Sequence, residues 1–329
     1  MKKFAILGHP VAHSLSPKLH NAVFQALGLK DYHYGALDVL PEQLPEVLQK
    51  MRAGEYQGFS VTIPHKQAVM EYCDELSERA RRVGAVNTLI KGCKGCKGFK
   101  GFKGCKGCER NLIVGDNTDY VGFEKSLIEA GVIQKSAGVG FAASIGKRKP
   151  TNVTSNETGN RYEQRNRKTS KALVLGSGGA SKAVVAVLKD LGFKVVVASR
   201  NPKDTSTVSY AKLDPEDNYG MIVNCTPVGM TENPKSQNPN STKNENIILK
   251  DEKWYRADRV YVDVVYTPRI TPFLKKAQGA GAKIVTGDRM FLWQAAEQAR
   301  LFIGSQILQI TQMLQIVRVM EEILDKNIE

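Results

Sequence analysis

A strand, a glycine-rich turn and a helix follow one another over residues 172–188, and this run constrains the fold more than any other feature of the chain. Apolar residues 172–175 precede the turn Gly176-Ser177-Gly178-Gly179, and Ala180 opens a stretch typical of a helix. Glycines at such a turn let the backbone approach a pyrophosphate, which then rests on the amide groups of the helix N-terminus. The segment therefore predicts a parallel α/β domain that binds a dinucleotide.

The end of the following strand indicates which dinucleotide this is. Apolar residues 195–198 run into Ser199-Arg200-Asn201, with no acidic residue before Asp204. A domain that prefers NAD places Asp or Glu near the end of this strand, where the carboxylate holds the ribose 2′-hydroxyl. Arg200 instead matches a 2′-phosphate by its charge and by its forked geometry. The sequence therefore predicts NADP as the cofactor.

The length of 329 residues suits two domains rather than one core. The first 90 residues alternate predicted strands and helices, which indicates an α/β layer architecture there as well. One predicted helix spans residues 16–27, with Ser16 as its N-cap and Pro17 in the next position. Near the C-terminus, apolar residues from Ile307 to Leu324 recur at helical spacing, and we expect this amphipathic helix to pack on its own domain.

Lys66 occupies an unusual position in this pattern. Residues 59–63 alternate apolar and polar side chains, as in a half-buried strand, and Pro64 ends that strand. Residues 65–78 are predicted to form a helix, which places Lys66 in its first turn, where the macrodipole disfavours a cation. Most lysines are solvated surface residues, so a functional role for this one depends on what the rest of the chain supplies.

The positive charge of the chain is concentrated in two segments. Lys91–Arg110 and Lys135–Lys171 carry +6 and +7 of the formal net charge of +14, so the remainder is close to neutral. This distribution does not indicate a dedicated nucleic-acid-binding fold. The apolar run at Phe4–Leu7 is too short for a secretory signal, and no run approaches the roughly 18 apolar residues of a membrane helix. We therefore expect a cytoplasmic protein that does not associate with membranes.

Three polar segments, 91–109, 136–170 and 231–246, are predicted to be flexible inserts. The first is an array of Lys-Gly-Cys and Lys-Gly-Phe triplets that places two Cys-x-x-Cys units eight residues apart. Paired units of this kind indicate zinc, here through Cys93, Cys96, Cys105 and Cys108. The favoured alternative is a low-complexity expansion of a hairpin loop, with no metal bound.

Several further motifs complete the pattern. Ser14 and Ser16 lie in a loop before a helix, where hydroxyl groups and amides together can bind a carboxylate. Taken in order, the motifs resemble those of the shikimate dehydrogenases and extend over almost the whole chain apart from the inserts. The matching segments are Gly8–Asn21, Gly58–Lys66, Gly84–Leu89, Gly115–Phe123, Gly176–Ala183, Asn224–Met230, Val262–Pro268 and Gly287–Ala296.

The resemblance implies a role for each matching residue. Ser14 and Ser16 would hold the substrate carboxylate, Thr62, Lys66, Asn87, Asp119 and Gln294 its hydroxyl groups, and Tyr266 would line the site. NADP would be held by Gly176, Ser177, Gly178, Gly179, Ala180, Ser199, Arg200 and Asn201, with Thr226, Val264, Gly287 and Met290 on the nicotinamide side. The substrate-binding domain would comprise residues 1–118 and 289–329, and a Rossmann-like domain with a parallel sheet would comprise residues 119–288.

The activity that the resemblance implies is the reversible, NADPH-dependent reduction of 3-dehydroshikimate to shikimate, a step of aromatic amino acid and chorismate biosynthesis. The reduced ketone needs a proton, which a cationic lysine can supply, and a neighbouring carboxylate keeps that lysine charged. Lys66 and Asp119 are the predicted pair. The alternatives are a quinate/shikimate dehydrogenase of broader specificity, a sensor that binds NADP or shikimate without turnover, and a metal or redox sensor built on the cysteine triplets. The sequence leaves a homodimer open.

Overall fold

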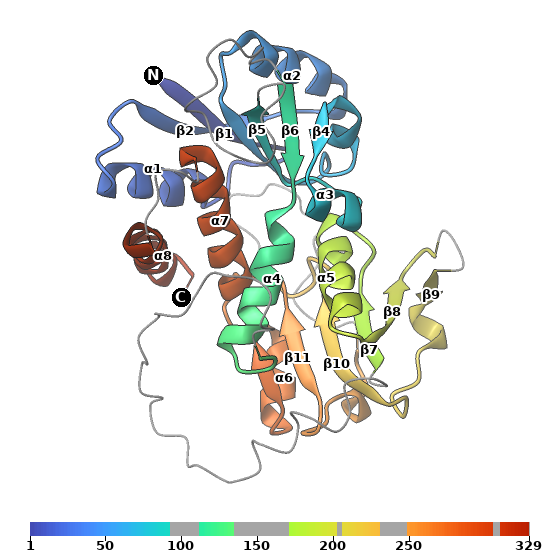
Figure 1. Ribbon diagram of the computed structural model, residues 1–329. Coiled ribbons are helices and arrows are strands. Elements are labelled where there is room, and N and C mark those ends of the chain that lie inside the picture. The colour runs from blue at the N-terminus through green and yellow to red at the C-terminus, as the bar shows by residue number, and fades with distance from the viewer. Residues whose placement is uncertain (93–111, 135–170, 203–205, 231–248, 305–309, 329) are drawn as a thin grey trace.

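Two six-stranded sheets, each with helices against it, make up the computed structural model shown in Figure 1. The structure describes residues 1–92, 112–134, 171–202, 206–230, 249–304 and 310–328. The expected α/β fold with two domains is confirmed, while the residue boundaries between the domains stay a prediction. All four cysteines of the triplet array, and most of the three predicted inserts, lie outside the described residues.

The first sheet is mixed, with the strand order β2-β1-β3-β5-β6-β4. β1 pairs with β2 and β3 in parallel, whereas β5 is antiparallel to both β3 and β6. The predicted strands at 59–63 and 85–90 are both shifted along the chain. The bounds are β1 Lys2–Gly8, β2 Tyr32–Asp38, β3 Gly58–Val61, β4 Glu75–Leu76, β5 Thr88–Gly92 and β6 Leu112–Asp116.

The second sheet is entirely parallel, with the strand order β12-β11-β10-β7-β8-β9. Its central strand is the one that precedes the glycine-rich turn, and residues 172–175 are fully buried there, as their apolar character predicts. The bounds are β7 Lys171–Leu175, β8 Lys194–Ser199, β9 Thr207–Ser209, β10 Tyr219–Asn224, β11 Val260–Asp263 and β12 Lys283–Val285.

Helices cover both sheets and connect them. In Figure 1, α4 descends from the end of β6 toward the second sheet, with α5 and α7 on either side of it. The α-helices are α1 Ser16–Ala26, α2 Leu44–Ala53, α3 Glu78–Val83, α4 Thr118–Glu129, α5 Gly179–Asp190, α6 Pro272–Gly279, α7 Gly287–Ile303 and α8 Ile310–Asp325. Short 3₁₀ helices are η1 Pro41–Gln43, η2 Ala68–Tyr72, η3 Tyr210–Lys212 and η4 Glu252–Trp254. Within the described ranges, no helix combines the length and the apolar character needed to cross a membrane.

The helix predicted over residues 65–78 is wrong. Residues 63–67 form a turn, and only the short 3₁₀ helix η2 follows. The reason lies in the partner of one carbonyl group: the backbone oxygen of Lys66 accepts a hydrogen bond from Val86 N at 2.7 Å instead of from a residue one helical turn later. Lys66 therefore lies in the turn that follows β3 and is not part of a helix.

The predicted N-cap of α1 is also wrong by one residue. Leu15 occupies the cap position and Ser16 is the first helical residue. The hydroxyl group of Ser14 accepts a hydrogen bond from the Ser16 N–H at 3.2 Å, so the serine two positions earlier satisfies an amide at this helix end. The side chain of Ser16 is thus not used as a cap.

The C-terminal helix α8 packs on α1 and α7, as the sequence predicts. Its buried residues are Met313, Ile316, Met320 and Leu324, spaced three or four apart along one face. They join a core that includes Leu19 and Phe24 of α1 and Phe302 of α7. α8 therefore completes the core of the first sheet rather than presenting its apolar face to solvent.

Candidate active site

Lys66 and Asp119 form an ion pair between the two sheets, with Nζ 2.6 Å from Oδ2. Lys66 lies in the turn after β3, and Asp119 lies in the first turn of α4. The Asn117 side chain caps α4 by accepting a hydrogen bond from Tyr120 N at 3.2 Å. Both charged side chains are largely buried, at 15% and 7% exposure, which strengthens their attraction relative to a surface pair. The two residues predicted to work together are therefore in direct contact.

Asn87 holds the second oxygen of this carboxylate. Its Nδ2 donates to Asp119 Oδ1 at 2.8 Å and lies 3.0 Å from Thr118 Oγ1. Its Oδ1 accepts from the Thr118 N–H at 2.7 Å. Both carboxylate oxygens of Asp119 thus have a donor, so the orientation of the group beside Lys66 is fixed.

The predicted substrate residues come from several separate parts of the chain. Gly8 and Thr62 abut, because a Cβ atom on Gly8 would lie 2.2 Å from Thr62 Cγ2. Ser14 and Thr62 are half-buried, whereas Ser16 is buried. Tyr266 stacks on Phe291 with ring centroids 4.3 Å apart and planes 7° apart, and burial raises the pKa of its phenol.

Gly122 explains how Gln294, another predicted substrate residue, is positioned. A Cβ atom on Gly122 would lie 2.5 Å from Met290 O and 2.9 Å from Gln294 Cβ, so α4 and α7 can approach this closely only at a glycine. Gly122 lies one turn after Asp119 on α4. The close approach therefore places the segment of α7 that bears Met290 and Gln294 alongside the helix that carries Asp119.

The glycine-rich turn suits a dinucleotide. Gly176 has a φ of +103°, which only glycine adopts readily, and a Cβ atom on it would lie 2.9 Å from Thr226 Cγ2. Gly178 is the N-cap of α5 and supplies no side-chain cap, while a Cβ atom added to it would meet open space. The amide groups at this helix end therefore fit a phosphate group. Ala180 lies in the first turn of the same helix.

The turn also lies against the ion pair. A Cβ atom on Gly179 would be 3.1 Å from Lys66 Cδ, so the lysine stem packs on the glycine that opens α5. At the end of β8, Ser199 Oγ is 3.3 Å from Ser177 Oγ and accepts a hydrogen bond from Asn201 N at 3.3 Å. Arg200 follows β8 and is exposed, so its guanidinium group is accessible to a 2′-phosphate.

A buried carboxylate orders the loops that carry Thr226, Val264 and Gly287. Asp263 Oδ1 accepts from Asn224 Nδ2 and Val265 N, both at 3.0 Å, and Oδ2 accepts from the Thr271 hydroxyl at 2.6 Å. Asn224 in turn accepts from the Thr226 hydroxyl at 2.7 Å, and its backbone oxygen accepts from Val264 N at 3.0 Å.

Burial raises the pKa of Asp263 to about 6, against the lowering effect of these hydrogen bonds. Sequence reasoning gave no role to Asp263 or Asn224, although both stand in motifs that carry the family resemblance. A Cβ atom on Gly287 would lie 2.3 Å from Val265 O, so the loop after β11 touches the start of α7 at another obligatory glycine.

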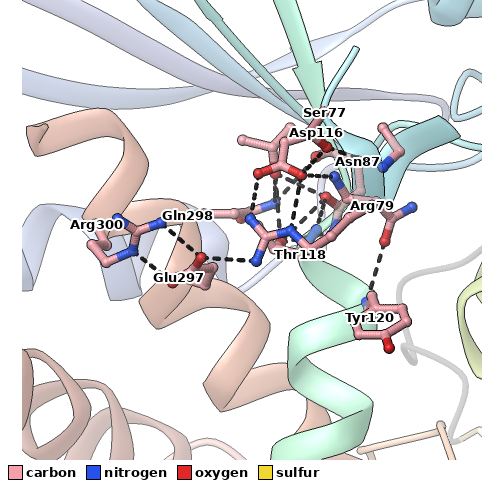
Figure 2. A network of polar contacts seen from close by, with 12 residues as sticks. Ser77, Arg79, Asn87, Asp116, Thr118, Tyr120, Glu297, Gln298 and Arg300 are labelled. Carbon is pink, nitrogen blue, oxygen red and sulfur yellow. Dashed lines mark hydrogen bonds and ion pairs between the residues drawn. The ribbon is translucent and has the colours of Figure 1, made fainter. Parts of the chain in front are cut away.

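A second group of charges lies beside the ion pair (Figure 2). Arg79 of α3 bonds to the fully buried Asp116 and reaches Glu297 of α7 at 3.1 Å, and Glu297 accepts from Arg300 Nε at 2.7 Å. Burial raises the pKa of Glu297, but the hydrogen bonds and charges of Arg300 and Arg79 outweigh it and the net shift is downward. These pairs connect α3, β6 and α7 around the candidate site. The described ranges contain no group of three or more potential ligands arranged to hold a metal ion.

A parallel sheet with an open glycine-rich turn, facing a buried lysine–carboxylate pair on a second α/β domain, defines the class of two-domain dehydrogenases that use a nicotinamide dinucleotide. A sequence profile described as "Shikimate dehydrogenase substrate binding domain" matches residues 6–89. The chain belongs to the shikimate dehydrogenase family, since it is 32% identical to a shikimate dehydrogenase (NADP(+)) of Exiguobacterium over 89% of each chain.

Other comparisons agree. A shikimate dehydrogenase (NADP(+)) of Methanocaldococcus jannaschii is 32% identical, with 92% of each chain covered. Among solved structures, a shikimate dehydrogenase in complex with NADP+ has a TM-score of 0.70 and 27% identity, covering 100% of this chain and 96% of its own. A Thermus thermophilus enzyme in complex with NADP(H) and shikimate has a TM-score of 0.65 and 29% identity, covering 97% and 100%.

Proposed function

We propose that this chain catalyses the reversible reduction of 3-dehydroshikimate to shikimate with NADPH. The observation that carries the proposal is the ion pair between Lys66 and Asp119, packed against the first glycine of α5. The curated relatives bear the name shikimate dehydrogenase (NADP(+)), and this chain covers about nine-tenths of their length.

The residues of the site divide the chemistry between them. Bound NADPH supplies a hydride to the ketone carbon, and the carbonyl oxygen then needs a proton. The ammonium group of Lys66 stabilises the developing negative charge and donates that proton, while Asp119 keeps the lysine charged and aimed. In the reverse direction the neutral amine takes the proton from the hydroxyl of shikimate.

The remaining residues would bind the two ligands. In this proposal Ser14 and Ser16 hold the substrate carboxylate, and Thr62, Asn87, Tyr266 and Gln294 surround its ring. On the cofactor side, Arg200 pairs with the 2′-phosphate, and the amides of Gly178, Gly179 and Ala180 meet the pyrophosphate. Thr226, Val264, Gly287 and Met290 border the nicotinamide.

We further propose that the reaction takes place in the cytoplasm and serves the synthesis of chorismate and the aromatic amino acids. We divide the chain into a substrate-binding domain of residues 1–118 and 289–329 and a cofactor domain of residues 119–288. The contents of the two sheets support this division. A homodimer stays a prediction. Analytical ultracentrifugation, which measures the mass of the particle in solution, would test it.

Initial rates test the activity. Shikimate and quinate would each be assayed with NADP and with NAD, on protein shown to be folded by circular dichroism. We expect the highest kcat/KM for shikimate with NADP. Comparable rates with quinate would instead support the broader quinate/shikimate dehydrogenase, and absence of turnover with all four pairs, in protein that still binds NADPH, would support a sensor.

A further inference from the structure

Gln298 lies one helical turn after Gln294 on α7 and is buried behind the candidate site. Its side chain contacts polar groups of β3 and of the start of β5. Oε1 accepts from the Ser60 hydroxyl of β3 at 2.8 Å. Nε2 donates to the backbone oxygen of Asn87 and to the Thr88 hydroxyl of β5, both at 3.1 Å. Both N–H groups of this amide are therefore used, and its oxygen accepts one hydrogen bond.

These hydrogen bonds form a chain with one direction. The Tyr34 hydroxyl donates to Ser60 Oγ at 2.6 Å, and Ser60 then has only its own proton to give to Gln298. The amide of Gln298 donates to Thr88 Oγ1, which gives its proton to Asn87 Oδ1 at 2.8 Å. Because each hydroxyl carries one proton, reversing any link would leave two donors or two acceptors facing each other.

The chain ends at the amide that touches the catalytic carboxylate. Since Asn87 Oδ1 receives protons from Thr88 and from the Thr118 N–H, its Nδ2 must face Asp119 Oδ1. The opposite orientation would place the amide oxygen against the carboxylate and leave both donors without a partner, which costs about 1–3 kcal/mol for each buried group.

We propose that Gln298 is a positioning residue for proton transfer: through Thr88 it fixes the orientation of the Asn87 amide, and thereby holds Asp119 in place beside Lys66. Gln298 touches neither Lys66 nor Asp119, so it acts through another residue. The inference rests on the proposed function and adds a residue that neither the motifs nor the comparisons assign.

Two buried titratable groups lie close to this chain of hydrogen bonds. His20 of α1 stacks on Tyr34 with ring centroids 4.4 Å apart, and burial lowers its pKa to about 3, against the raising effect of an interaction with Gln298. Burial likewise raises the pKa of the Tyr34 phenol, against the hydrogen bonds of Ser60 and Ser16. On the other side, Arg79 and Asp116 are paired with each other. Titration of His20 or Tyr34 would therefore not account for a change in the pH profile of kcat near neutral pH.

The test compares three variants with the parent. Gln298→Met keeps the size of the side chain but removes both polar atoms, and Thr88→Val removes the next hydroxyl in the chain. Ser126→Ala is the matched control, because it also deletes a buried hydrogen bond, from Ser126 Oγ to Phe123 O at 2.8 Å, on the neighbouring helix α4. Rates of shikimate oxidation, KM for both substrates and thermal midpoints would be measured for each.

We expect Gln298→Met and Thr88→Val each to lower kcat about tenfold, with KM for NADP unchanged. The pH profile of kcat should change in both variants, because Asp119 is no longer held in place beside Lys66. Thr88→Ser, which keeps the hydroxyl, should recover most of the rate. Ser126→Ala should lower the thermal midpoint without changing kcat or the pH profile.

Two results would overturn the inference. If Gln298→Met and Thr88→Val lower the thermal midpoint but retain the parent's kcat and pH profile, the hydrogen-bonded chain is structural only. If the folded parent turns over no shikimate, the proposed function fails and the positioning role fails with it. The two failures differ in the parent's own rate, so they cannot be confused.

Discussion

At the scale of single residues, the surroundings of Lys66 decide what it can do. Its ammonium group contacts Asp119, and its aliphatic stem lies against Gly179 at the start of α5. A bare cation near a helix N-terminus is disfavoured by the macrodipole. The carboxylate compensates for that, and a bound cofactor phosphate would add further negative charge to the same region. Lys66 is thus held between Asp119 at the start of α4 and Gly179 at the start of α5.

Replacing Lys66 by Ala should lower kcat by roughly 10² to 10⁴ while the affinity for NADPH stays nearly unchanged, because the proton donor is lost but the phosphate site is intact. Steady-state rates and NADPH fluorescence titration measure the two effects separately. Lys189→Ala removes an exposed lysine from the far end of α5 and serves as the control. Near-normal turnover in the Lys66 variant would exclude the assigned role.

Asp263 illustrates a buried acid whose charge opposes stability. Its pKa rises from the model-compound value of 3.8 to about 6 in the fold, mainly through burial. The folded state therefore binds the proton more tightly than the unfolded chain does. The carboxyl group accordingly makes the protein less stable as pH rises from about 4 through about 6, and the penalty is constant above that range.

Asp263→Asn should remove this pH dependence while still accepting hydrogen bonds from Asn224 and Val265. We expect its stability relative to the parent to increase by about 1 kcal/mol between pH 5 and pH 7.5. Urea midpoints at the two pH values measure the change. Asp258→Asn is the control, because a hydrogen bond from the Arg256 side chain lowers the pKa of that carboxyl group. An equal pH effect in both variants would contradict the explanation.

At the scale of elements, local sequence predicted those features whose partners are local. The strand, turn and helix at 171–190 need only apolar residues and glycines in order, and the structure agrees closely with the prediction. The helix predicted at 65–78 failed because the carbonyl of Lys66 bonds to Val86, a residue twenty positions away that no periodicity reveals. The hydrogen bonds of Gln298 could not be predicted from the sequence either, since its partners Ser60 and Thr88 are more than 200 residues away along the chain.

The sequence alone also did not show why some glycines are needed. Gly122 belongs to a motif that the sequence identified, but its role depends on the approach of α7 to α4. The ion pair of Lys66 and Asp119 could be predicted because the family resemblance named both residues and a carboxylate near a lysine keeps it charged. Its supporting amides could not, because hydrogen-bond direction is a property of the folded arrangement.

α8 offers a test of how an element contributes to the whole core. Met320 is fully buried against α1 and α7, whereas Arg318 on the same helix is exposed. Met320→Ala should lower the free energy of unfolding by about 2–5 kcal/mol, since it leaves a cavity in the core. Arg318→Ala should change it by less than about 0.5 kcal/mol. Urea unfolding followed by tryptophan fluorescence compares the two, and equal losses would show that α8 is not part of this core.

At the scale of the whole molecule, polar contacts among α3, α4 and α5 link the helices of the two sheets. Arg82 of α3 pairs with Asp190 of α5, and the Tyr120 hydroxyl donates to the same carboxylate at 2.6 Å. Lys182 of α5 donates to Gln67 at 3.1 Å, the residue that follows Lys66 in the chain. Figure 1 shows α3 directly above α5, where these contacts lie. They set the separation across which a hydride and a proton must both be delivered.

Asp190→Lys should therefore impair catalysis without touching either ligand, because it places a second cation opposite Arg82 and pushes α3 away from α5. We expect kcat/KM to fall about three- to tenfold at low ionic strength. The ratio to the parent should approach one in 0.5 M KCl, where salt screens charges beyond roughly 4 Å. Combining Asp190→Lys with Arg82→Glu restores opposite charges and should recover most of the rate, apart from the lost Tyr120 bond. A double variant as slow as the single one, at both salt concentrations, would show that this contact does not govern the separation of the domains.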